Sequence, residues 1–302
     1  MTAGTVHPDQ QDGSNEKERL TGQEWRARRD DHRRRVDALI GPYLDARRKG
    51  VKHPVIDFLF TYYSARPSHV LRWHPGFGVV LQDADEFLPL RGYERTESGV
   101  HVGLDYVRRR RDALRATVDL LGATAARPAR LGCFGLHEWA MVYRTDEARH
   151  DVPLRLGRAG TDRVVEQMPL RCTHFDAFRF FTGPARPRNE NQLSRASQID
   201  HEQPGCLHAT MDLYRHCFTL APLLPAGLTV DCFELALRAR DLDMRASPYD
   251  LRDLGYEPVP IETPAGRAEY VREQSAIADA GTQLRAEVLR RCTNLAGIAR
   301  HA

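Results

Sequence analysis

The sequence lacks the segments by which several classes of protein are recognised. Six of its 302 residues are cysteines, scattered without a CxxC pair, which argues against a zinc knuckle and a disulfide scaffold. No apolar run approaches the roughly 20 residues needed to span a bilayer, and the polar N-terminus has no secretion signal. We therefore expect a cytoplasmic protein with reduced cysteines and no membrane contact.

Short catalytic and nucleotide-binding motifs are missing as well. The chain contains no GxGxxG, GxxxxGK[ST] or GxSxG, so dinucleotide-binding, P-loop and α/β-hydrolase interpretations lack support. His137 and Glu138 do not begin an HExxH zinc motif, because Met141 stands where the second histidine belongs. We also find no internal repeat with a period of roughly 20 to 50 residues.

Charge is nearly balanced overall but unevenly distributed. Lys and Arg number 44 against 41 Asp and Glu, giving a net charge of +3. Between Thr21 and Lys52 there are ten basic and five acidic side chains, and Arg108 to Arg111 is an unbroken basic run. Such patches either bind a polyanion or form solvated helix faces.

The patterning predicts a helix-rich α+β fold with small antiparallel strands. We expect residues 1–18 to be a disordered tail and residues 19–302 to form a single compact domain. A hairpin is expected at 93–96 and 100–102, and a strand pair at 153–157 and 163–166. Helices are expected where apolar residues recur at helical spacing or where helix-start signals occur, over residues 22–49, 53–63, 105–121, 207–224, 228–245 and 263–289.

The stretch from Leu131 to Phe181 places reactive polar side chains in an apolar and aromatic setting. Its members are His137, Glu138, His174 and Asp176. A buried carboxylate or imidazole costs several kcal/mol unless it is paired. These residues therefore form either a satisfied internal hydrogen-bond network or an active site.

His174-Phe-Asp176 has the most specific local spacing. On a strand, both polar side chains would share one face. A later histidine, with His208 the best candidate, would complete a two-histidine, one-carboxylate site for Fe2+. This metal site is an alternative to an enzyme without a cofactor.

Aromatic side chains occur close to these carboxylates in the sequence. Trp139, Tyr143 and Phe175 lie near Glu138 or Asp176, and Trp73 precedes them in the chain. Aromatic walls beside a carboxylate can stack on a cationic purine and stabilise the sugar cation that forms when the base leaves. Ordinary core packing explains the same pattern.

Seven blocks of the chain carry a resemblance to a known family, and they comprise residues 53–63, 72–76, 135–144, 172–181, 202–208, 242–250 and 261–271. These blocks resemble a family of actinobacterial proteins described as 3-methyladenine DNA glycosylases. The resemblance extends from about Arg35 to Leu289 and implies hydrolysis of the N-glycosidic bond of an alkylated purine. The glycine-rich hairpin of helix-hairpin-helix glycosylases is not found, so the resemblance assigns no catalytic residue.

Together these observations predict an N-glycosidic hydrolase acting on a nucleobase or nucleoside, most simply in DNA. Its catalytic candidates are Asp176, Glu138, His174 and His137, and its substrate-binding candidates are Trp73, Trp139, Tyr143, Phe175 and Arg144. Arg108–Arg111 and the Arg186–Arg195 loop would meet DNA phosphates. The alternatives are a metal-dependent oxygenase or hydrolase, built on His174, Asp176 and His208, and a non-catalytic interaction protein.

Overall fold

The computed structural model describes residues 18–146 and 152–301. It is 58% helical, and its described residues form twelve α-helices and a small four-stranded mixed sheet. The predicted helix-rich α+β class is therefore confirmed. The helices are α1 (Gly22–Arg48), α2 (Ile56–Thr61), α3 (Pro67–Leu71), α4 (Leu104–Arg109), α5 (Arg111–Ala125), α6 (Leu136–Ala140), α7 (Gly157–Gln167), α8 (Phe175–Phe178), α9 (Gln198–His201), α10 (Leu207–Thr219), α11 (Ala226–Arg245) and α12 (Pro264–His301).

The sheet has the order β1-β2-β4-β3 and comprises β1 (Glu18–Leu20), β2 (Val79–Leu81), β3 (Tyr93–Thr96) and β4 (Gly99–Val102). The predicted hairpin β3–β4 is confirmed, but β1 pairs with β2 in parallel, so the sheet is mixed and not purely antiparallel. Of the predicted tail, residues 1–17 lie outside the described part, and Glu18 belongs to β1. Gly99 has φ +137°, and a Cβ there would stand 2.4 Å from the carbonyl oxygen of Leu81.

Local signals explain where the long helices begin. Thr21 and Glu24 form a capping box at the start of α1, in which each side chain bonds the other residue's backbone N–H. At the start of α12, the hydroxyl of Thr263 accepts a hydrogen bond from the Gly266 N–H at 3.0 Å. Pro264 occupies the first helical position, where its missing N–H is no loss.

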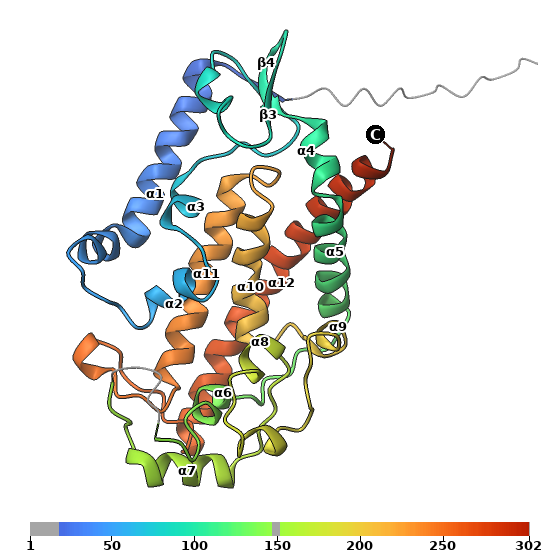
Figure 1. The fold of residues 1–302 in the computed structure, drawn as a ribbon. Helices are drawn as coiled ribbons and strands as arrows, with labels where there is room; N and C mark the ends of the chain where they lie inside the picture. Colours follow the sequence, from blue (N-terminus) through green and yellow to red (C-terminus); the bar gives the residue numbers. More distant parts are fainter. Residues whose placement is uncertain (1–17, 147–151, 302) are drawn as a thin grey trace, which may run out of the picture.

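Three long helices, α10, α11 and α12, form the centre of the molecule (Figure 1). Helix α10 packs against α11 and α12, and α5 packs along α12. In the view of Figure 1 the β3–β4 hairpin lies at the top, and α6, α7, α8 and their connecting loops lie at the bottom. No helix of the described residues is long and apolar enough to cross a membrane.

Three predictions of secondary structure need correction. The expected strand pair at 153–157 and 163–166 is wrong, because residues 157–167 form helix α7. Its buried side chains, Thr161, Val164 and Val165, follow a helical spacing, which a short apolar pair preceded by two glycines conceals in the sequence. The helix expected over 53–63 is confined to α2, and α5 continues past the expected stop at Gly122.

Candidate metal centre

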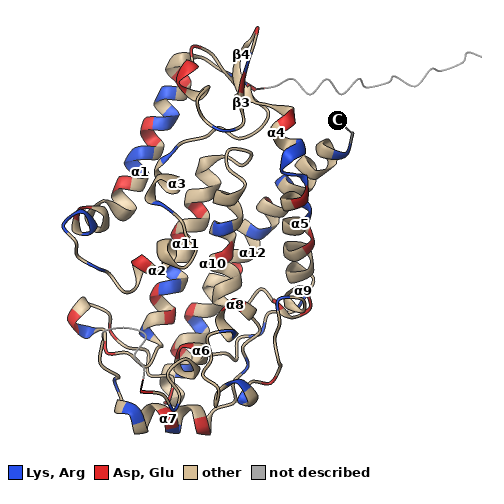
Figure 2. Ribbon diagram, viewed as in Figure 1, with Lys and Arg blue, Asp and Glu red and all other residues tan. Residues whose placement is uncertain are grey.

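Charged residues occur along the central helices α10, α11 and α12 (Figure 2), and several of them are buried. His208 and Asp212 lie one turn apart on α10, and Arg240 and Asp243 lie one turn apart on α11. All four are at most 3% exposed. Residues spaced by three or four positions share one helix face. Because α10 packs against α11, these faces bring ionisable groups into the core.

A first group joins His137 of α6, His208 of α10 and Asp243 of α11. Each residue offers one ligand atom, and these atoms all lie within 4.8 Å of one another. Nε2 of His137 is 2.8 Å from Oδ1 of Asp243. Within the described part of the chain, neither atom has a hydrogen-bond partner of acceptable geometry. Three such ligand atoms within 4.8 Å of one another could hold one metal ion.

A buried ion-pair network binds the oxygen of Asp243 that does not face His137. Nη1 of Arg240 donates to Oδ2 of Asp243 at 2.8 Å and to Oε1 of Glu138 at 2.7 Å. The guanidinium of Arg240 also lies over the ring of Phe58, with Cζ 3.9 Å from the ring centroid. Arg240 therefore engages one oxygen of Asp243 and leaves the other directed at His137. Contacts of this kind orient metal ligands.

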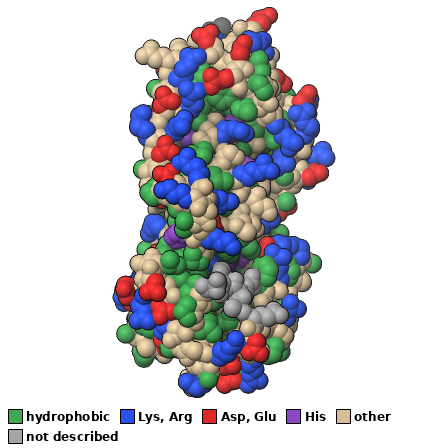
Figure 3. Space-filling model, turned by 60° about the vertical axis from the view of Figure 1, so that its left-hand side comes forward, with side chains coloured by type: hydrophobic (Ala, Val, Ile, Leu, Met, Phe, Trp, Pro, Cys, Tyr) green, Lys and Arg blue, Asp and Glu red, His purple; other side chains and the backbone are tan. Residues whose placement is uncertain are grey.

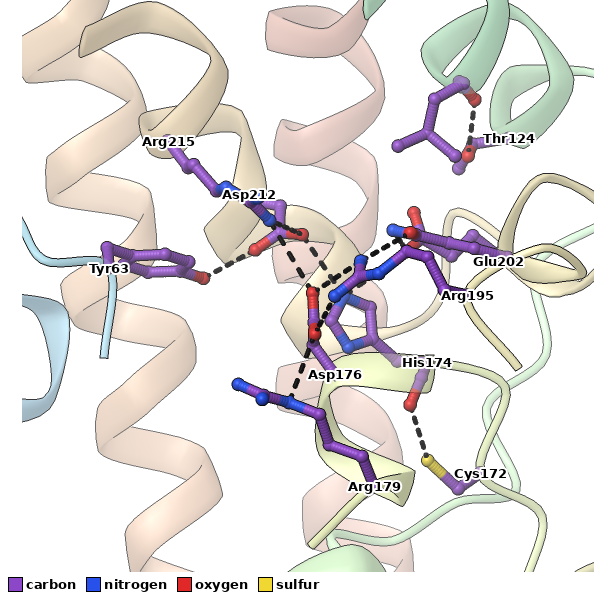
Figure 4. A network of polar contacts seen from close by, with 12 residues as sticks. Tyr63, Thr124, Cys172, His174, Asp176, Arg179, Arg195, Glu202, Asp212 and Arg215 are labelled. Atoms are coloured by element: carbon purple, nitrogen blue, oxygen red, sulfur yellow. Dashed lines mark hydrogen bonds and ion pairs between the residues drawn. The ribbon is translucent and has the colours of Figure 1, made fainter. Parts of the chain in front are cut away.

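A second group joins His174, Glu202 and Asp212, whose ligand atoms also lie within 4.8 Å of one another (Figure 4). Nε2 of His174 is 3.2 Å from Oδ2 of Asp212 and 3.4 Å from Oε1 of Glu202. An ion bound at about 2.1 Å separates neighbouring ligand atoms by about 3.0 Å in octahedral and about 3.4 Å in tetrahedral coordination. The spacings of 3.2 Å and 3.4 Å are therefore compatible with a divalent metal site, as well as with the direct hydrogen bond between His174 and Asp212.

The second group is also oriented by surrounding residues. The hydroxyl of Tyr63 donates to Oδ1 of Asp212 at 2.8 Å, which leaves Oδ2 facing His174. Burial and the charge of Asp212 raise the pKa of Tyr63 well above its usual value, so the hydroxyl keeps the proton that it donates. Figure 4 shows this bond entering from the side opposite Glu202.

The two groups adjoin each other through His208. Its ring lies 4.5 Å from the ring of His137 and 5.1 Å from the ring of His174, measured between centroids. His208 thus contacts one histidine of each group. Sites that bind two metal ions place them roughly 3.5 to 4 Å apart. Such a short separation requires the ligands of the two ions to lie next to each other, as the two groups do at His208.

Protonation in the two groups follows from burial and charge. Burial alone would lower the pKa values of His137 and His174, but Asp243, Asp212 and other nearby carboxylates more than offset it, so both are raised. The pKa of His208 is lowered well below its usual value by burial and by its two histidine neighbours, and its imidazole is neutral. A neutral imidazole is the form that binds a metal. The raised pKa values of His137 and His174 mean that the nearby carboxylates favour positive charge at these two rings.

The donor set suits a catalytic metal better than a structural one. Structural zinc sites are usually closed by four ligands that include cysteine, whereas catalytic sites use three protein ligands and keep a position open. Each group offers three donors among the described residues, all of them imidazole nitrogens or carboxylate oxygens. His137, His208 and Asp243 make the two-histidine, one-carboxylate set typical of non-haem iron(II) enzymes.

Asp176 occupies a different environment from the one that its spacing suggested. His174-Phe-Asp176 is not a strand, because Phe175–Phe178 form helix α8 and His174 precedes it. Asp176 turns away to a cluster of arginines (Figure 4): Arg195 binds both carboxylate oxygens, and Arg179 and Arg215 approach within 3.2 Å and 3.6 Å. The structure keeps His174 and His208 close together, and the carboxylates beside His174 are Glu202 and Asp212.

The aromatic side chains expected to form pocket walls do not gather around one carboxylate. Trp73 stacks on Trp25 at 6.5 Å, beside a surface hollow lined also by Arg29 and Arg72. Trp139 is fully buried, and its indole N–H donates to the carbonyl of Ala246 at 2.8 Å. This tryptophan is therefore committed to packing.

The remaining wall residues are engaged by neighbouring side chains. The hydroxyl of Tyr143 and the guanidinium of Arg144 both bind Glu166, at 3.2 Å and 2.6 Å. Phe175 lies under the guanidinium of Arg195, with Cζ 4.8 Å from its ring centroid. Glu138, a catalytic candidate, pairs with Arg240 and so contributes to the network behind Asp243.

The arginines expected to meet DNA phosphates are largely engaged with the protein itself. In the run Arg108–Arg111, Arg110 donates to the carbonyl of Thr219 at 2.6 Å. In the Arg186–Arg195 loop, Arg188 donates to the carbonyl of Glu166 at 3.0 Å. On the face shown in Figure 3, basic side chains are interspersed with acidic and apolar ones over its upper part. DNA binding stays a prediction.

Sequence reasoning missed Glu202, Asp212, Arg240 and Asp243 as site residues. A signal for two of them was present, because His208 and Asp212 are four positions apart on a helix that was itself predicted. Arg240 and Asp243 stand three positions apart in the other predicted central helix. Two ionisable residues on one face of an otherwise apolar helix indicate a buried site.

Comparisons with known protein families, with curated proteins and with solved structures found no match to this chain.

Proposed function

We propose that this protein is a metal-dependent enzyme of the non-haem iron type, with its metal centre among α6, α8, α10 and α11. The observation that carries the proposal is the contact between His137 and Asp243. Their facing atoms are 2.8 Å apart and form a buried ion pair, but the two atoms do not meet the geometry of a hydrogen bond. Burying such a pair costs the hydration of both groups, and a shared cation would offset that cost.

The second group extends the proposal to two ions. Its spacings of 3.2 Å and 3.4 Å fall in the range of neighbouring ligands around one ion, and its carboxylates are buried with His174. Helical bundles are a common setting for such centres, in which histidines and carboxylates project inward from facing helices. When bound, the metal supplies an electrophilic centre that activates water or dioxygen.

The chain's own residues would orient and isolate this centre. Arg240 and Tyr63 fix the outer oxygens of Asp243 and Asp212, so each carboxylate presents one oxygen to the metal. His208 is held neutral between the two groups. The apolar core around α10 and α11 keeps bulk water away, which strengthens every electrostatic interaction inside. The predicted glycosylase activity needs none of these features, so the geometry favours the metal-dependent alternative.

Metal content tests the proposal. Protein purified without chelator is incubated anaerobically with iron(II), desalted and measured by elemental analysis, beside the variants His137→Gln and His174→Gln. We expect wild-type protein to retain iron and each variant to retain less. His216→Gln is the matched control, because His216 is a histidine of α10 outside both groups. Wild-type protein without iron, or variants with unchanged iron, would overturn the proposal.

A further inference from the structure

A polar hollow of about 470 Å³ lies on the surface next to the two ligand groups. It is formed by two segments that precede α6 and α8 and by the loop after α8. Its lining residues are Arg130, Leu131, Gly132, Cys133, Arg171, Thr173, Glu190 and Asn191. Most of these side chains are polar, so the hollow suits a polar ligand better than an apolar one.

The hollow reaches the candidate metal centre at two points. Sγ of Cys133 lies 3.7 Å from Nδ1 of His137, whose other nitrogen faces Asp243. Thr173 immediately precedes His174 in the chain and also lines the hollow. A molecule in the hollow that touches Cys133 would therefore be separated from His137 by that side chain alone.

Positive charge prevails around the hollow. Its lining carries two guanidinium groups and one carboxylate, and the carboxylate of Glu190 is 3.5 Å from Arg171. The Arg130 guanidinium has no partner among the residues that the structure describes. The backbone of Arg130 is fixed, since Oε1 of Gln203 accepts from its N–H at 2.8 Å and Nε2 of Gln203 donates to its carbonyl at 3.2 Å. A free cation on a fixed backbone is a means of binding an anion.

We propose that this hollow is the substrate site and that it takes a small anionic molecule, a carboxylate or a phosphate ester. Arg130 binds the anionic group, and the rest of the molecule extends past Cys133 toward the metal centre. This inference rests on the proposed function and adds the chemical class of the substrate and its route of entry.

Alkylation of Cys133 tests the anion preference without any metal. Its thiolate displaces iodide from either iodoacetate, an anion, or iodoacetamide, which is neutral, and peptide mapping assigns the product to each cysteine. We expect the rate with iodoacetate divided by the rate with iodoacetamide at Cys133 to be about three- to tenfold higher in wild-type protein than in Arg130→Gln. One nearby positive charge attracts the anionic reagent by about that factor. Arg34→Gln, which removes an exposed arginine of α1, is the control and should keep the wild-type ratio.

Competition and metal readouts complete the test. Malonate and inorganic phosphate should each slow labelling of Cys133, and the more effective of the two identifies the anionic group. An equal ratio in wild-type protein and Arg130→Gln, with no slowing by either anion, overturns the proposal.

In iron(II)-loaded protein, carboxymethylation of Cys133 should slow formation of the nitrosyl adduct at the metal. An unchanged rate also overturns the substrate assignment. A protein that keeps its anion preference but binds no iron refutes the proposed function itself, and the substrate assignment with it.

Discussion

The hydrogen bond from Tyr63 to Asp212 offers the sharpest test of how the metal centre is built. Tyr63 is 8% exposed and Asp212 is 2% exposed, and the Tyr63 hydroxyl donates to Oδ1 of Asp212 at 2.8 Å. Replacing Tyr63 with Phe removes this bond and leaves the ring in place. A buried hydrogen bond to a charged group contributes about 1.5–3 kcal/mol, so Tyr63→Phe should lower the free energy of unfolding of metal-free protein by that amount.

Metal affinity should fall as well, because the bond holds Asp212 with its other oxygen toward His174. Loss of an outer contact to a metal ligand typically costs about 10- to 100-fold in metal affinity. Urea denaturation gives the stability, and competition with a chromogenic chelator gives the affinity. Both should be measured on the same preparation of the variant.

Tyr214→Phe is the matched control. Tyr214 is a fully buried tyrosine of α10, and its hydroxyl has no hydrogen-bond partner in the described part of the chain. Its removal should change stability and metal affinity little. If Tyr63→Phe lowers stability but leaves the metal affinity equal to that of Tyr214→Phe, Asp212 is not a metal ligand.

Three further predictions follow from the same network. The folded-state pKa values of His137 and His174 are raised, so metal-free protein should lose stability as the pH rises above about 6.5. Metal-loaded protein should keep its stability over the same range. Thermal unfolding of both forms between about pH 6 and 9 measures the difference. Arg240→Met should destabilise the protein by about 3–5 kcal/mol, because Glu138 and Asp243 lose their shared partner. The double variant with Glu138→Gln should recover part of the lost free energy of unfolding, measured by urea denaturation. No recovery would argue against the shared network. Asp176→Asn should lower stability by about 1–2 kcal/mol, because Asp176 binds solvent-exposed arginines. The iron content should not change, because Asp176 lies outside both ligand groups. A loss of iron would show that Asp176 contributes to metal binding.

Much of the fold could be predicted because its signals are local. The central helix α11 has a continuous apolar stripe, α12 begins at Thr263-Pro264, and the β3–β4 hairpin turns through Glu97-Ser98, directly before Gly99. Helix α7 was mistaken for strands because Val164 and Val165 are adjacent, and such a short apolar run does not distinguish the two structures. The parallel pairing of β1 with β2 joins segments about 60 residues apart, which no local pattern reveals.

The site was predicted in part. The sequence indicates His137, Glu138 and His174 as polar residues in an apolar setting and His208 as a candidate metal ligand, and all four are buried in the structure. Their partners come from other helices, so pairing Glu138 with Arg240 or His174 with Glu202 depends on tertiary packing. The prediction of Asp176 as a catalytic residue assumes that His174 and Asp176 act together because they are close in sequence, and the structure separates their side chains into different environments.

Anomalous diffraction from crystals of manganese(II)- or iron(II)-loaded protein tests the central claim most directly. We predict one anomalous peak among His137, His208 and Asp243 and a second among His174, Glu202 and Asp212, each about 2.0–2.3 Å from its ligand atoms. Peaks confined to surface carboxylates, or no peak at either group in metal-soaked crystals, would contradict the account.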